Sequence, residues 1–93
     1  MNMSDDKLKA YRSQAISMAL INIFDERQTA EAMQLWETRY AGMPIFSVQY
    51  FARDCCALPS VNKPNSELLK NLVRELYLQL HTLENIQLDQ NRR

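Results

Sequence analysis

The sequence predicts an all-α protein, a small four-helix bundle that packs further through dimerisation. In the 93 residues, 46% are hydrophobic, and only one Gly and three Pro interrupt the chain. Apolar residues recur at steps of three and four, the spacing of one face of an α-helix, between these interruptions. This length fits one domain, 1–93, whose ends at 1–4 and 89–93 we expect to be frayed tails. The predicted helices are 5–25, 29–41, 45–58 and 66–87.

The first helix has signals at its start and along its length. Ser4 can cap it, and Asp5 and Asp6 lie at the positive end of the helix dipole. Two apolar stripes follow at helical spacing, which predicts contact with more than one neighbour. The stripes are Leu8, Tyr11, Ala15 and Met18, and Ile16, Leu20 and Ile23.

The second helix is bounded by a polar break at 25–28 and by Gly42. Thr29 is its predicted N-cap, and Gly42 stands where a left-handed residue ends a helix, with Pro44 two residues later. Aromatic side chains dominate interface energetics, so Trp36, Tyr40 and, further along, Tyr50 are candidate partner anchors. The helical spacing of Trp36 and Tyr40 is nevertheless more typical of a core.

The third segment, 45–58, has two possible starts and two possible conformations. Pro44 suits the first position of a helix, and Ser47 suits its N-cap. Residues 45–51 are also rich in strand formers. Because no second segment pairs with them as a strand, a helix is favoured.

The last helix follows a loop at 59–64 and is capped by Asn65 or Ser66. Its leucines step by four and three, which is a heptad pattern. We predict that this seam forms the dimer or partner surface, with the first helix packed against it. The seam residues are Leu69, Val73, Leu76, Leu80 and Leu83.

The charge pattern limits the classes of partner that the sequence predicts, and the lack of a targeting segment limits the predicted compartment. Eleven Lys and Arg balance eleven Asp and Glu, and no block of like charge occurs. A nucleic-acid binder usually carries a basic excess, and a membrane-surface helix needs a polar face rich in Lys and Arg. No signal peptide or spanning helix fits the sequence. We therefore expect a cytoplasmic protein that does not bind a membrane.

The sequence offers little material for catalysis or for a cofactor. The only imidazole is His81, and one Gly does not make a phosphate-binding loop. Cys55 and Cys56 are adjacent, so they cannot join distant segments, and they lack the spacing of zinc ligands. We predict no enzymatic activity and no catalytic, cofactor or metal site.

A helix-turn-helix that binds DNA is the alternative interpretation. Residues 29–58 would supply two helices, with Gly42 in the turn. On the second helix only Gln49 and Arg53 are able to read bases, and the neighbouring Asp54 would repel phosphate. Nucleic acid is therefore the disfavoured partner.

The width of the apolar faces is the main functional clue. It predicts a non-enzymatic adaptor or regulator that works through helix–helix contacts, with itself as a homodimer, with another protein, or with both. The competing interpretation is a compact monomer in which every apolar stripe is covered within the domain.

Overall fold

The computed structural model describes residues 5–62 and 65–91, and the side chains of residues 6–62 and 65–82. The described residues are helical without any strand, so the predicted all-α class with four helices is confirmed. The elements are α1 (Asp5–Ile23), α2 (Glu26–Leu35), the π-helical turn η1 (Trp36–Tyr40), α3 (Val48–Cys56) and α4 (Ser66–Asn91). The predicted cap Ser4, the loop residue Pro64 and the side chains of Asp5 and Leu83 lie outside the described parts.

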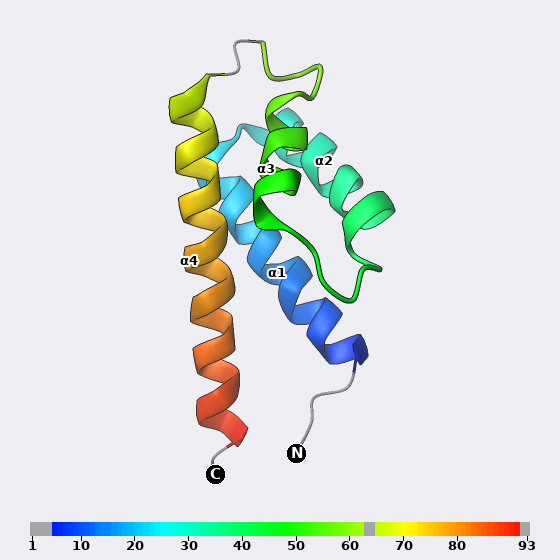
Figure 1. The fold of residues 1–93 in the computed structure, drawn as a ribbon, viewed down its shortest axis with the longest axis vertical. Coiled ribbons are helices and arrows are strands. Elements are labelled where there is room, and N and C mark those ends of the chain that lie inside the picture. The colour runs from blue at the N-terminus through cyan, green and yellow to red at the C-terminus, as the bar shows by residue number, and fades with distance from the viewer. Residues whose placement is uncertain (1–4, 63–64, 92–93) are drawn as a thin grey trace.

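Two long helices, α1 and α4, form the frame of the molecule. They run antiparallel and side by side, while α3 packs on α4 and α2 packs on α1 (Figure 1). Apolar side chains from every helix meet in one core. The largest fully buried side chains are Ile16, Leu20, Trp36, Phe51, Cys55, Leu72 and Leu76.

The start of α2 differs from the prediction. Asp25, not Thr29, is the N-cap: the Gln28 N–H donates to Asp25 Oδ1 at 2.8 Å, and the Asp25 N–H donates to Gln28 Oε1 at 3.1 Å. This reciprocal capping box satisfies two backbone donors at once, which a lone threonine hydroxyl does not do. The helix therefore begins at Glu26, and Thr29 lies within its first turns.

The end of this helical segment also differs. The Ala41 N–H donates to the Trp36 carbonyl at 2.8 Å, five residues back, so the chain leaves through a π turn. Gly42 has no positive φ, and the prediction of a left-handed residue there is wrong. Apart from Gly42 itself and its two chain neighbours, no described heavy atom lies within 4 Å of the position that a Cβ at Gly42 would take. Neither backbone conformation nor space requires glycine at this position.

The caps of the last two helices lie among the predicted candidates. The Tyr50 N–H donates to Ser47 Oγ at 3.5 Å at the start of α3, and Pro44 remains outside the helix. The Leu68 N–H donates to Asn65 Oδ1 at 2.7 Å at the start of α4. α3 ends at Cys56, two residues before the predicted end, and α4 continues to Asn91, past the predicted 87.

Candidate interaction surfaces

The predicted heptad seam of α4 faces the inside of the chain. Leu76 is fully buried, and Leu69, Val73 and Leu80 are partly buried against the same core. That core contains residues of α1 and α3, the two helices on which α4 packs most extensively. Leu76 is thus covered within one chain, whereas Leu69, Val73 and Leu80 keep part of their surface open.

Two of the three predicted aromatic anchors are core residues. Trp36 and Tyr40 are buried, and their ring centroids lie 5.5 and 5.2 Å from that of Phe51 in edge-to-face contacts. The Trp36 indole N–H donates to Ser13 Oγ at 2.8 Å, which satisfies the one polar atom of the side chain. Tyr50 is exposed. Of the three, only Tyr50 is open to a partner.

The phenol of Tyr40 ties η1 to α3. Its hydroxyl donates to Asp54 Oδ2, and Arg39 Nη1 lies 3.3 Å from the same oxygen. Burial raises the pKa of Tyr40 to about 12, and the hydrogen bond and charge of Asp54 raise it further than the guanidinium of Arg39 lowers it. The neutral phenol is therefore the form that the fold stabilises.

This pKa predicts a loss of stability at high pH. Folding raises the pKa of Tyr40 from 10.0 to about 12, so its contribution is complete below pH 10.0 and is lost as the pH rises through about 12. Urea unfolding across this window should give a falling free energy of unfolding. Tyr40→Phe has no phenol to ionise, so its free energy should fall less steeply. If the free energy of unfolding fell equally steeply with pH in both proteins, the neutral phenol of Tyr40 would not be a source of stability.

The two cysteines have no feature of a reactive pair. Both are free and buried, and burial raises the pKa of each thiol, so both stay protonated at neutral pH. His81 is exposed. Among the residues that the structure describes, no three His, Cys, Asp or Glu side chains lie close enough to hold a metal ion.

A polar cluster marks the contact between α1 and α4. The Asn22 side-chain amide donates to Glu75 Oε1 at 2.7 Å, and the Gln79 amide donates to the same oxygen at 3.0 Å. These hydrogen bonds lower the pKa of Glu75. The carboxylate is therefore held by two uncharged donors.

Exposed apolar side chains lie in the turns next to this cluster. Met18 lies one turn before Asn22 on α1, and Leu78 lies one turn after Glu75 on the antiparallel helix α4, so both follow the Asn22–Glu75 hydrogen bond in the same direction along the helix pair. Ile21 is in the next turn of α1. The exposed fractions of Met18, Ile21 and Leu78 are 45%, 62% and 56%. We call these three residues the outer face.

The outer face carries little charge. Gln14 lies four residues before Met18, and Asn71 lies four residues before Glu75; both side chains are uncharged. Thr82, four residues after Leu78, donates its hydroxyl to the Leu78 carbonyl at 2.8 Å. The charged side chains near the face are Glu75, the exposed Arg74 four residues before Leu78, and the exposed Asp25 four residues after Ile21.

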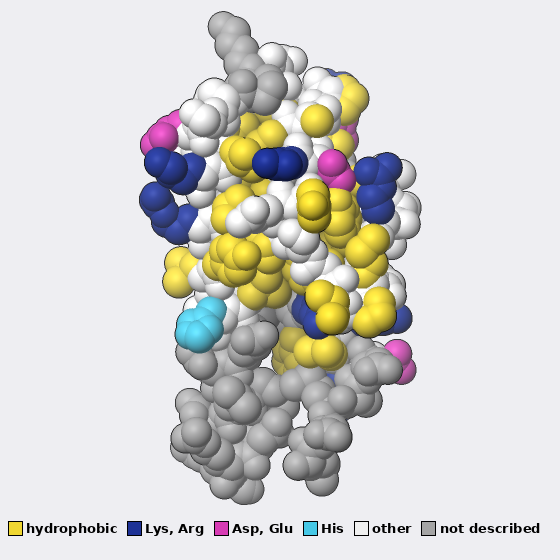
Figure 2. Space-filling model, in the orientation of Figure 1, with side chains coloured by type: hydrophobic (Ala, Val, Ile, Leu, Met, Phe, Trp, Pro, Cys, Tyr) yellow, Lys and Arg dark blue, Asp and Glu magenta, His cyan; other side chains and the backbone are white. Residues whose placement is uncertain are grey.

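A second surface lies between α3 and the first turns of α4. It is a shallow groove of about 310 Å³, and cations stand beside it. Figure 2 shows apolar side chains gathered between α3 and α4 on this side of the molecule, with Lys and Arg side chains around them. The groove is lined by Arg53, Cys56, Ala57, Asn65, Ser66 and Leu69.

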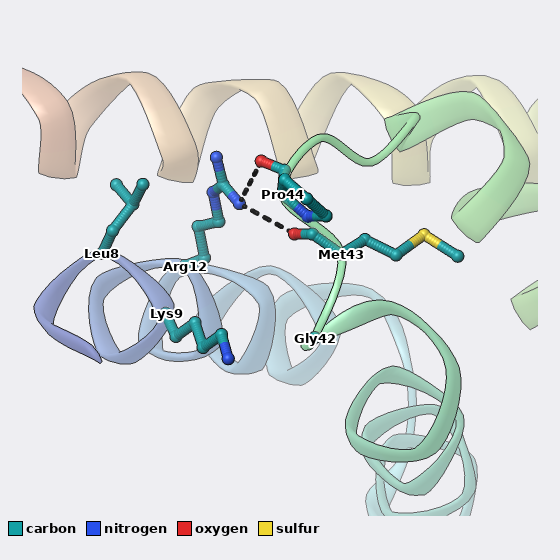
Figure 3. A pocket seen from close by; sticks show the side chains of 6 residues that line it. All are labelled: Leu8, Lys9, Arg12, Gly42, Met43 and Pro44. Carbon is teal, nitrogen blue, oxygen red and sulfur yellow. Dashed lines mark hydrogen bonds between the residues drawn. The ribbon is translucent and has the colours of Figure 1, made fainter. Parts of the chain in front are cut away.

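The third surface is a hollow of about 210 Å³ where the 41–47 connection meets α1. Arg12 reaches from α1 and donates to the carbonyls of Met43 and Pro44 at 3.4 and 3.2 Å, whereas Lys9 lies along α1 (Figure 3). The guanidinium carbon of Arg12 is 5.8 Å from the ring centroid of Phe46. Arg12 therefore fastens the connection to α1 and is already engaged.

The geometry does not form the tight turn that a helix-turn-helix needs. Residues 41–47 separate η1 from α3, whereas the turn of that motif has about three or four residues. Gln49 and Arg53 are both exposed on α3. Arg53 takes part in the groove described above, while Gln49 is not among its lining residues.

Sequence reasoning missed most of the exposed apolar residues. Met18 belongs to a predicted apolar stripe of the first helix, yet its side chain is exposed, and so is that of Leu78. The one available signal was Ile21, an isoleucine that belongs to neither apolar stripe of the first helix. Exposed Tyr77 had no such signal.

Comparison with known proteins gives no relative. No family model, no curated protein and no solved structure matches the chain. In the part of the chain that the structure describes, no helix is both long enough and apolar enough to cross a membrane.

Proposed function

We propose that the protein is a non-enzymatic adaptor or regulator of the cytoplasm that acts through helix–helix contacts, and that a second copy of the chain is one of its partners. The observation that carries this proposal is the outer face, where three large apolar side chains of α1 and α4 stand in solvent. Contiguous exposed apolar side chains are typical of an interaction site. Two free cysteines fit a reducing compartment such as the cytoplasm.

The chemistry of the outer face favours a second copy as the occupant. In a two-fold interface each patch meets the same patch, so every unpaired charge would face its own copy nearby. The side chains of Met18, Ile21 and Leu78 carry no charge, and the Glu75 carboxylate near them accepts hydrogen bonds from Asn22 and Gln79. These three apolar side chains can therefore meet their own copies without like-charge repulsion.

A pair of matched isoleucine substitutions tests this assignment. Ile21→Asp places a carboxylate in the outer face, whereas Ile45→Asp makes the same change on the 41–47 connection, at a side chain that is 86% exposed. Burying two new charges in one dimer interface should raise the dissociation constant about 100-fold. In sedimentation velocity Ile21→Asp should be monomeric, and Ile45→Asp should behave as the unmodified protein.

Circular dichroism should show that both variants keep their helices, because both side chains are exposed. Self-association through the outer face would be refuted by an Ile21→Asp chain that sediments like the unmodified protein. It would also be refuted if Ile45→Asp dissociated the dimer equally.

A further inference from the structure

We infer that the groove between α3 and α4 binds an acidic peptide segment of a partner protein, which places one apolar side chain in the groove and carboxylates on the cations beside it. The site is separate from the outer face. Leu69 in the groove and Leu78 in the outer face are nine residues apart, which on a helix of 3.6 residues per turn sets them on opposite sides of α4. A dimer formed through the outer face would leave both grooves open.

The floor of the groove is apolar. Cys56 is buried and Leu69 half-buried, and the exposed Ala57 adds a methyl group at the end of α3. Tyr77 is exposed two turns further along α4 from Leu69. A floor of this kind accepts an apolar side chain, and it offers no buried polar group that would oppose one.

The cations beside the groove are not used by the fold. Of the described arginines, Arg12 is bound to two carbonyls, Arg27 pairs with Glu31 and Arg39 pairs with Asp54. The side chains of Arg53 and Lys70 have no ion pair among the described residues.

Two cations lie at the groove. Arg53 lines its α3 wall, and the exposed Lys70 follows the lining residue Leu69 on α4. The carboxylate of the nearby Asp54 already binds Arg39 and Tyr40. The other carboxylate near the groove is that of Glu67, in the first turn of α4. The positive charge is therefore in excess here and favours a ligand with several carboxylates.

An acidic peptide with an apolar residue suits both the apolar floor and the cations, whereas duplex DNA suits only the cations. Phosphates would pair with the cations but would leave the apolar floor of Cys56, Ala57 and Leu69 unfilled. A helical or extended peptide with a Leu or Phe between Asp and Glu residues would place its apolar side chain on the floor. Its carboxylates would pair with the cations at the same time, as in other peptides that bind in a groove.

The test uses the full chain and fluorescein-labelled synthetic peptides in an anisotropy titration. The first peptide carries a central Leu flanked by Asp and Glu, the second has Lys in place of the acidic flanks, and the third has Ser in place of the Leu. A labelled DNA duplex is the fourth probe. We expect the first peptide to bind about tenfold or more tightly than each of the others, with an affinity that falls as salt rises.

Charge-reversal variants locate the site. Arg53→Glu and, independently, Lys70→Glu should each weaken binding of the acidic peptide about tenfold or more. Arg27→Glu, which makes the same change of net charge on α2, should leave binding within about twofold, because its side chain is 83% exposed and outside the groove. All three variants should keep the helical circular dichroism and the sedimentation behaviour of the unmodified protein.

The inference is overturned if the acidic peptide binds no better than the Lys-flanked one, if Arg27→Glu weakens binding as much as Arg53→Glu, or if the duplex binds more tightly than the acidic peptide. These outcomes do not depend on self-association. A monomeric chain that still binds the acidic peptide would refute the dimer and leave the groove assignment standing.

Discussion

Replacing Trp36 by alanine should lower the free energy of unfolding by about 3–5 kcal/mol, as is typical for a large aromatic side chain in a core. Trp36 is almost fully buried, and it contacts the rings of Tyr40, Phe46 and Phe51. Alanine would leave a cavity where three elements meet, because α2 continues into η1 at this residue and Phe51 belongs to α3. Urea unfolding followed by circular dichroism measures the loss.

Two further substitutions make this result specific. Trp36→Phe retains a ring but loses the hydrogen bond to Ser13, so it should cost less than Trp36→Ala. Tyr50→Ala removes an exposed aromatic ring and should change the free energy by no more than about 0.5 kcal/mol. A loss below about 1 kcal/mol for Trp36→Ala would show that this core is not the one that stabilises the fold.

The second large effect is expected at Leu76. Its side chain is 0% exposed, so Leu76→Asp would place a carboxylate among apolar side chains with no partner. We expect a loss of more than about 4 kcal/mol, which is a large part of the total stability of a domain of this size. Thermal unfolding followed by circular dichroism should show a transition that is lost or shifted to a much lower temperature.

Leu78→Asp is the matched control for this experiment. It makes the same chemical change two residues further along α4, at a position that is 56% exposed. This variant should stay folded and lose self-association, because Leu78 belongs to the outer face. A folded, monomeric Leu76→Asp protein would contradict the structure, since it would return the dimer contact to the heptad seam.

The sequence was sufficient for the number of helices and for two of their caps. Ser47 and Asn65 act locally, through hydrogen bonds to a backbone N–H three residues ahead, so the pattern of residues contains the information. The same reasoning chose Thr29 over Asp25. It overlooked that Gln28 lies three residues after Asp25 and returns a hydrogen bond to it.

The π turn had no local signal. It depends on tertiary contacts, because the wider turn lets the rings of Trp36 and Tyr40 stack at 6.4 Å and both meet Phe51. One of these rings, Phe51, belongs to α3 and is distant in sequence from the turn. Helix propensity and apolar periodicity depend only on residues that are close in sequence. They therefore predicted an α-helix that ends at Gly42.

The heptad seam illustrates a different limit. A periodic apolar stripe indicates that a helix face is covered, but the same stripe results whether α1 and α3 or a second chain covers it. Leu76 is covered within the chain. Ile21, which belongs to no predicted stripe, is exposed, and it is part of the surface that we propose for a second chain.

The net charge of zero concealed the cationic groove in the same way. Eleven positive and eleven negative side chains cancel in the composition, yet they are not equally engaged in the fold. Arg39 is held by Asp54, while Arg53 and Lys70 have no ion pair among the described residues. Only the three-dimensional arrangement separates engaged cations from those that are available to a ligand.

The most direct test of self-association is the molar mass of the unmodified protein in solution. Multi-angle light scattering over a series of protein concentrations should give a mass that rises toward twice the chain mass of 10.9 kDa. Circular dichroism on the same samples should show the helical fold throughout. A mass that stays at 10.9 kDa at every concentration, with the helices intact, would contradict the proposal.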